Sequence, residues 1–162
     1  MLAKKCGGNA RFLYNRSLGA GRRDGDIDIL AISASGVFVI DVKHYQGKKV
    51  EVRRTGGLFT EKREELVVGG RDQTKLLASV SRQFEAVCRV VTQHPLGSQV
   101  AVRSALCFVG AEWPLFGTLS IAGVPILGAK GASKLILGGD SVLSVTTQAQ
   151  LYEMLAALLP AA

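Results

Sequence analysis

The hydrophobic pattern in the first third of the chain predicts a β-hairpin. Ile27–Ile32 is a mostly apolar segment, and Val37–Ile40 is a continuous apolar run of the kind that forms buried strands. Between them, Ser33–Gly36 has the composition of a turn. Upstream, a short extended segment that begins at Phe12 is expected to end in a glycine- and arginine-rich loop from Gly19 to Gly25.

Shorter apolar segments predict more strands further along the chain. Lys49–Arg54 and Leu58–Lys62 flank Thr55–Gly57, which predicts a second hairpin. Three later strands are expected at 102–109, 119–121 and 124–127.

Two stretches have the spacing of helices. From about residue 72 to 92, apolar residues recur at spacings of three and four with polar residues between them, and Pro95 is expected to close this helix. The apolar positions are Leu76, Val80, Phe84, Val87 and Val91. A last helix is expected from about 147 to 159, with Thr147 and Gln150 as a capping box.

This order of elements predicts one domain over residues 1–162. Strands come first and long helices later, with one strand between the helices, which is typical of an α/β or α+β sandwich. A length of 162 residues suits a single core, and 48% hydrophobic with 20% charged residues is typical of a globular protein. No apolar run approaches the roughly 20 residues that span a bilayer, so no membrane association is expected.

Cysteine usage and the first residues indicate a reducing compartment. Cys6, Cys88 and Cys107 are odd in number and form neither a CxxC pair nor a metal-binding pattern, so we expect free thiols, two of them buried. The first eleven residues lack the apolar segment of a signal peptide. A cytoplasmic location is therefore expected.

Positive charge is concentrated in the first part of the chain. The net charge is +7, and residues 1–102 carry all of it, because residues 103–162 hold three basic and three acidic residues. Clustered lysines and arginines gain affinity for polyanions by counterion release, so a nucleic acid is a reasonable partner. A solvated basic surface that only aids solubility would explain the charge equally well.

Residues suited to metal chemistry are expected to meet at one end of the first hairpin. Antiparallel pairing brings Asp28 beside Asp41, and Lys43 shares a strand face with Asp41 because it lies two residues on. Asp28, Asp41 and the backbone carbonyl of Val42 could hold a divalent cation, Mg²⁺ or Mn²⁺. Lys43 could orient the attacking water or stabilise charge on a phosphate. The alternative is a hairpin end where these groups form only a solvated salt bridge.

The sequence around these residues resembles the nuclease-related domain (NERD) family. The resemblance rests on 25–30, on 35–43 with Gly47, and on 107–116 and 124–127, and it covers roughly residues 12–137. It implies a restriction-endonuclease-like PD-(D/E)xK fold, with a central mixed β-sheet flanked by helices. It also implies metal-dependent cleavage or processing of nucleic acid, with DNA as the expected substrate. In that family pattern Asp28 and Asp41 would be metal carboxylates, and Lys43 would be the catalytic lysine.

One element of the family pattern is expected to be missing. Proteins of this family usually begin with a helix whose glutamate completes the acidic cluster, whereas nothing acidic precedes Asp24 here. The first residues are few and glycine-rich, so we expect no N-terminal helix.

Further residues are candidates for contact with nucleic acid. Gln83 lies in the long helix, where nucleases of this superfamily often place a polar residue that touches water or phosphate. The preferred interpretation is nevertheless an exposed glutamine, since glutamine is a good helix former. The basic residues that flank the candidate site in sequence are expected to contact backbone phosphates without reading bases. Those chosen are Arg22, Arg23, Lys48, Lys49 and Arg53.

Three functions therefore stay open. The first is a metal-dependent nuclease, the second a non-catalytic nucleic-acid-binding module that keeps the nuclease fold, and the third a protein-interaction or regulatory domain. The retained carboxylates favour the first, since a module that only binds phosphate has no need of acids that repel it. The missing N-terminal acid favours the second.

Overall fold

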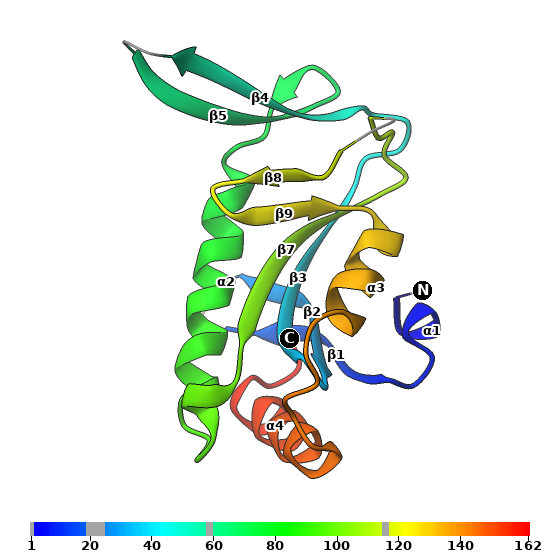
Figure 1. The fold of residues 1–162 in the computed structure, drawn as a ribbon, viewed down its shortest axis with the longest axis vertical. Coiled ribbons are helices and arrows are strands. Elements are labelled where there is room, and N and C mark those ends of the chain that lie inside the picture. Colours follow the sequence, from blue (N-terminus) through cyan, green and yellow to red (C-terminus); the bar gives the residue numbers. More distant parts are fainter. Residues whose placement is uncertain (1, 19–24, 58–59, 115–116) are drawn as a thin grey trace.

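A computed structural model describes residues 2–18, 25–57, 60–114 and 117–162, which form two β-sheets and their covering helices (Figure 1). The larger sheet has six strands in the order β1-β2-β3-β7-β9-β8. Their bounds are β1 Ala10–Ser17, β2 Asp26–Ser33, β3 Gly36–His44, β7 Val102–Val109, β9 Val124–Leu127 and β8 Leu119–Ile121. Pairs β1–β2, β2–β3 and β8–β9 are antiparallel, whereas β3–β7 and β7–β9 are parallel. The prediction of a central mixed sheet is confirmed.

The first predicted hairpin is present as β2 and β3. Its pairing runs from Ser33 opposite Gly36 to Ile29 opposite Ile40. Gly36 has a φ of +141°, and a Cβ atom there would overlap the carbonyl of Ala101, so the turn requires glycine. The apolar run that follows the turn has no polar alternation because helices cover both faces of the sheet.

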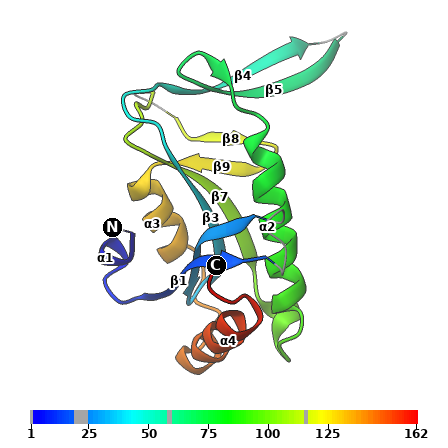
Figure 2. The same ribbon diagram turned by 180° about the vertical axis from the view of Figure 1, so that it is seen from behind.

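Two helices cover each face of this sheet (Figures 1 and 2). On one face, α2 (Leu76–Val91) and α4 (Val145–Leu158) pack against alternate residues of β3 that include Val37 and Val39. On the other face, α1 (Leu2–Cys6) and α3 (Ala129–Leu137) pack against Phe38 and Ile40. The period of two along β3 therefore decides which helix pair each side chain meets.

The second sheet consists of β4 (Val50–Gly57), β5 (Thr60–Val68) and β6 (Arg71–Asp72), and it projects beyond the end of α2 (Figure 1). The second predicted hairpin is therefore confirmed, although Thr55–Gly57 belongs to a strand and Gly57 pairs with Thr60. Leu58 and Phe59 lie outside the described residues. An apolar cluster joins the two sheets to α2, with Val50 and Leu66 from one sheet and Phe108 from the other.

The helix boundaries differ from the prediction for local reasons. Arg71 and Asp72 pair with the end of β5, and the Asp72 carboxylate accepts a hydrogen bond from the Thr74 amide at 2.8 Å, so α2 begins only at Leu76. The capping box proposed for the last helix was wrong. Ser144 is the N-cap of α4, and its hydroxyl accepts from the Thr147 amide at 3.1 Å.

Two helices were not predicted. The expectation that the first residues form no helix was wrong, since Leu2–Cys6 forms the short α1, which packs on α3 and carries no acidic residue. The sequence of α3 contains Gly131 and is bounded by Gly128 and Gly138, so its helical pattern is weak.

The cysteine and membrane predictions can be compared directly with the structure. Cys6, Cys88 and Cys107 are free, and Cys6 and Cys107 are buried, as expected. Burial raises the pKa of the Cys107 thiol to about 11. Among the described residues, no helix is both long and apolar enough to cross a membrane.

Candidate active site

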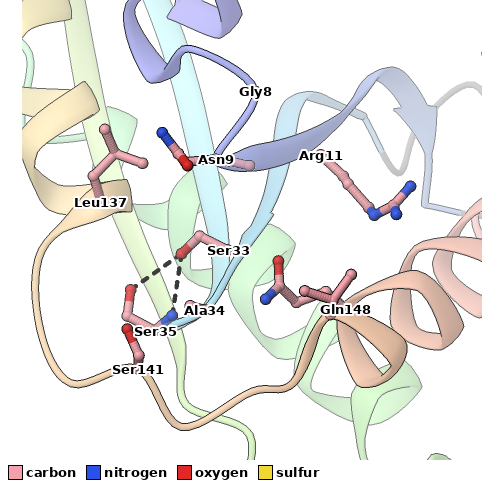
Figure 3. Close-up of a pocket in the computed structure, with 11 residues that line it drawn as sticks. Gly8, Asn9, Arg11, Ser33, Ala34, Ser35, Leu137, Ser141 and Gln148 are labelled. Atoms are coloured by element: carbon pink, nitrogen blue, oxygen red, sulfur yellow. Dashed lines mark hydrogen bonds between the residues drawn. The ribbon is translucent and has the colours of Figure 1, made fainter.

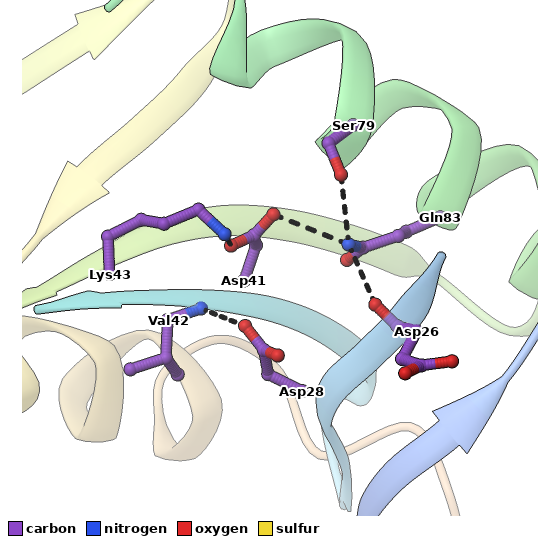
Figure 4. A network of polar contacts seen from close by, with 7 residues as sticks. All are labelled: Asp26, Asp28, Asp41, Val42, Lys43, Ser79 and Gln83. Carbon is purple, nitrogen blue, oxygen red and sulfur yellow. Dashed lines mark hydrogen bonds and ion pairs between the residues drawn. The ribbon is translucent and has the colours of Figure 1, made fainter. Parts of the chain in front are cut away.

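The candidate residues lie where β2 and β3 separate (Figure 4). Regular pairing of the two strands ends at Ile29 opposite Ile40, one residue short of Asp28 and Asp41. Beyond that point the Asp28 carboxylate takes over the place of a backbone partner, because its Oδ2 accepts a hydrogen bond from the Val42 amide at 2.7 Å. The predicted meeting of Asp28 and Asp41 at one end of the hairpin is therefore observed.

Asp41 points toward α2 and has no solvent exposure. It follows Val37 and Val39 on the same face of β3, so the period of the strand directs its carboxylate into the helix-covered side. Lys43 shares this face, as predicted, and its ammonium forms an ion pair with Asp41 Oδ1. The Lys43 side chain is 28% exposed, so its charge lies between the buried carboxylate and solvent.

Gln83 joins this network from α2 and is only 3% exposed, so the preferred interpretation of an exposed glutamine was wrong. Its amide nitrogen lies 3.3 Å from Asp41 Oδ2, 3.1 Å from the Asp26 carbonyl oxygen and 3.3 Å from Ser79 Oγ. A sequence signal was available, since Gln83 shares a helix face with the apolar Val80 and Val87. Asp26 and Ser79 were not among the predicted site residues.

One buried oxygen of this network lacks a partner. The Gln83 amide nitrogen donates to its neighbours, but the Gln83 carbonyl oxygen is buried without a hydrogen-bond partner. Asp41 Oδ1 is also buried, and it is paired with the Lys43 ammonium. The Gln83 carbonyl oxygen could therefore accept a further donor or a cation, because an unsatisfied buried oxygen is costly.

Burial is the largest influence on the protonation of Asp41. It raises the pKa of the Asp41 carboxyl above its usual value, and the neighbouring Lys43 ammonium opposes this effect. The nearby Asp28 raises the pKa further, whereas the Gln83 amide lowers it. Perturbed carboxylates of this kind gather at functional sites.

The available oxygen atoms fit a hard divalent cation. Asp28 and Asp41 offer carboxylates, and Gln83 offers its unpartnered amide oxygen. The Val42 carbonyl points to the same edge of β3 as the amide that reaches Asp28, because both groups of one strand residue face the same side. Within the described ranges, no group of three His, Cys, Asp or Glu residues is arranged to hold a metal. A metal site at this strand end would therefore need amide and backbone oxygens in addition to the two carboxylates.

The predicted phosphate-binding residues that the structure describes contact other groups than this network. Arg22 and Arg23 lie outside the described residues. Lys48 packs its aliphatic chain over Gly69 in the region of the second sheet, and Lys49 pairs with Glu51 at 2.7 Å. Arg53, also on β4, lies 3.9 Å from the same glutamate.

A separate cavity of about 690 Å³ lies at the opposite end of the hairpin, beside the Ser33–Gly36 turn (Figure 3). Asn9, Arg11 and Gln148 line it, together with Ser33 and Ser35. The two serine hydroxyls already donate to the Ile136 carbonyl at the end of α3, at 2.6 and 3.2 Å. The two serines hold α3 to the sheet, and we assign no chemistry to this cavity.

Comparison with known proteins gave one family match. A family model described as the nuclease-related domain matches residues 1–109, which extend from α1 to the end of β7 and include the whole network around Asp41. The curated proteins and the solved structures compared with the chain gave no match.

Proposed function

The chain belongs to the nuclease-related domain family, and we propose that it is a metal-dependent nuclease that hydrolyses phosphodiester bonds, with DNA as the first substrate to test. The observation that carries this proposal is the fully buried Asp41, surrounded by Asp28, Lys43 and Gln83, together with the buried Gln83 amide oxygen that has no hydrogen-bond partner. A buried carboxylate of raised pKa weakens the fold at neutral pH, which is typical of a group kept for function.

The cation would be held by Asp28, Asp41 and the Val42 carbonyl, with the Gln83 amide oxygen as a further oxygen donor. Bound Mg²⁺ or Mn²⁺ supplies a Lewis acid that makes water a better nucleophile and stabilises charge on the phosphoryl group. One carboxylate oxygen of Asp28, Oδ2, accepts the hydrogen bond from the Val42 amide. The other carboxylate oxygen of Asp28 could bind the cation.

Lys43 and Gln83 have different roles in this proposal. The Lys43 ammonium, held by Asp41 and partly open to solvent, donates to a phosphate oxygen or orients the attacking water. Gln83 is a positioning residue, because its amide nitrogen donates to Asp41 Oδ2 and to the Asp26 carbonyl and so fixes the carboxylate relative to β2.

A cleavage assay tests this function. Single-stranded, linear duplex and circular DNA are incubated with Mg²⁺ or Mn²⁺, with EDTA as the metal-free control. We expect metal-dependent cutting that Lys43→Ala lowers at least 100-fold, since removal of one charge-stabilising group typically costs about 10²–10³ in rate. Lys130→Ala on α3, which removes an exposed lysine from the opposite face of the sheet, should cut like the wild type. Circular dichroism must show that both variants are folded, and equal activity of the two would overturn the site assignment.

A second function agrees with one specific observation. Since the described residues contain two neighbouring carboxylates but no third, the domain would act as a nucleic-acid-binding module if the site holds no metal. Binding of DNA without cutting by the folded wild type, in either metal, would favour that alternative.

A further inference from the structure

Helix α2 carries a row of basic residues that the network around Asp41 does not use. Lys75, at the N-cap of the helix, is followed by Arg82 and Arg89 at intervals of seven residues, and all three are exposed. Seven residues are close to two helical turns, so these side chains lie along one line of the helix surface. At 1.5 Å per residue the row is about 21 Å long.

The row lies on the flank of α2 that faces β2. Gln83 points inward to Asp41 and to the Asp26 carbonyl. Phe84 and Ser81, on one side of that direction, line a groove against β7 and the β8–β9 turn. Arg82 is rotated from Gln83 by about 100° in the sense opposite to Phe84, so the row lies on the other side, along the strand that carries Asp28.

The charges of this row are available to a partner. The ion pairs formed by the described residues involve Lys43, Lys49, Arg53 and Arg54, not the row on α2. Glu85 is the acidic residue of α2, and it lies beside the row, three residues after Arg82 and four before Arg89. Its carboxylate accepts a hydrogen bond from the Ser81 hydroxyl at 3.2 Å. Lys75 lies close enough to Asp72 to lower the pKa of that carboxyl, so Arg82 and Arg89 are the sharper test positions.

We propose that Lys75, Arg82 and Arg89 form the surface that holds the phosphate backbone of a nucleic acid beside the site. The inference rests on the proposed function for the nature of the partner, and it assigns the contact to α2 rather than to the second sheet. Guanidinium groups match phosphate oxygens in pairs, and a straight row of cations follows a regular backbone without reading bases.

Equilibrium binding measured in EDTA separates this surface from catalysis. Fluorescence anisotropy with a labelled 30-base-pair duplex and a 30-nucleotide single strand is recorded between 50 and 200 mM salt. The test protein is the double variant Arg82→Ala with Arg89→Ala. The matched control is Lys130→Ala with Lys134→Ala, which removes two exposed charges from α3 on the opposite face of the sheet.

Loss of two phosphate contacts lowers the slope of log affinity against log salt by roughly 1.8 for a duplex, equivalent to roughly 60-fold weaker binding at 0.1 M salt. We expect this loss in the α2 double variant and wild-type binding in the α3 control, while Glu85→Gln should bind more tightly. Equal losses of DNA affinity in both double variants would show that only net charge matters and would overturn the proposal. Wild-type affinity of the α2 double variant would overturn it as well.

The outcomes for the binding surface and for the nuclease are distinguishable. A wild type that binds through α2 but cuts no substrate would keep this inference and refute the nuclease. A wild type that cuts DNA, with an α2 double variant that binds and cuts equally well, would refute the inference alone. No binding of either DNA by the wild type would overturn both.

Discussion

Replacement of Arg16 by alanine should destabilise the protein more than any exposed ion pair does. Arg16 lies on β1, and its guanidinium donates two hydrogen bonds to the C-terminal end of α4, to the carbonyls of Leu159 and Ala156, both at 2.6 Å. The last carbonyls of a helix have no partner within the helix and carry its negative dipole end, so a cation is the matching group.

The expected loss can be worked from these contacts. A hydrogen bond from a charged donor contributes about 1.5–3 kcal/mol. Because Arg16 is only partly buried, the two bonds together are taken at the lower end, about 2–3 kcal/mol. For a chain of 162 residues, each kcal/mol lowers Tm by about 2–4 °C, so Arg16→Ala should melt about 4–12 °C below the wild type.

Thermal unfolding followed by circular dichroism measures this loss, and two variants calibrate it. Arg16→Lys keeps the charge but not the two-pronged donor, and should lose about half as much stability. Arg54→Ala removes an arginine whose partner is Glu64, a partly exposed residue of the second hairpin, and such surface ion pairs contribute little to stability. If Arg16→Ala melts no lower than Arg54→Ala, the contact with α4 does not stabilise the fold and the reasoning fails.

Two further predictions concern buried titratable groups. Burial raises the pKa of Asp41, so its contribution to stability is full below the usual value of 3.8 and is lost as pH rises through the raised pKa. In EDTA, Asp41→Asn should therefore raise Tm at pH 7, and raise it by less at pH 4. An equal difference at both pH values would contradict this. Because the pKa of Cys107 is about 11, its thiol should resist a disulfide reagent at pH 8 in the native protein and react only on unfolding. The less buried Cys88 should react before it. Rapid labelling of Cys107 in the native protein would refute its burial.

The core of the site was predictable because its residues lie on the two strands of one hairpin, close together in the sequence. Two strands joined by a short turn fix the relative positions of Asp28, Asp41 and Lys43, since the strand period and the antiparallel register leave little freedom. The family resemblance added roles to positions that the strand geometry had already brought together.

Other parts of the structure were harder to predict because they depend on contacts between distant segments. Gln83 is a good helix former, so its helix propensity alone fits an exposed position equally well. Its place on the apolar face of the helix favours burial, and the packing of α2 on β3 shows that it is buried. Lys49 and Arg53 follow the site in sequence, yet the chain leaves the central sheet after His44. Arg53 lies on the second sheet, and Lys49 lies just before its first strand. The seven-residue spacing on α2 was present in the sequence, but the flank on which it lies depends on tertiary structure.

The contact between β1 and the end of α4 also constrains how this protein folds during synthesis. Arg16 and Leu159 are 143 positions apart, and the Ser17 amide donates to the Pro160 carbonyl at 2.8 Å in the same place. The strands that carry the acidic residues leave the ribosome early, but α4, which covers one of their faces, emerges after roughly 100 more residues. Contacts of such large separation form late, so nascent chains need protection from aggregation until the C-terminal helix docks.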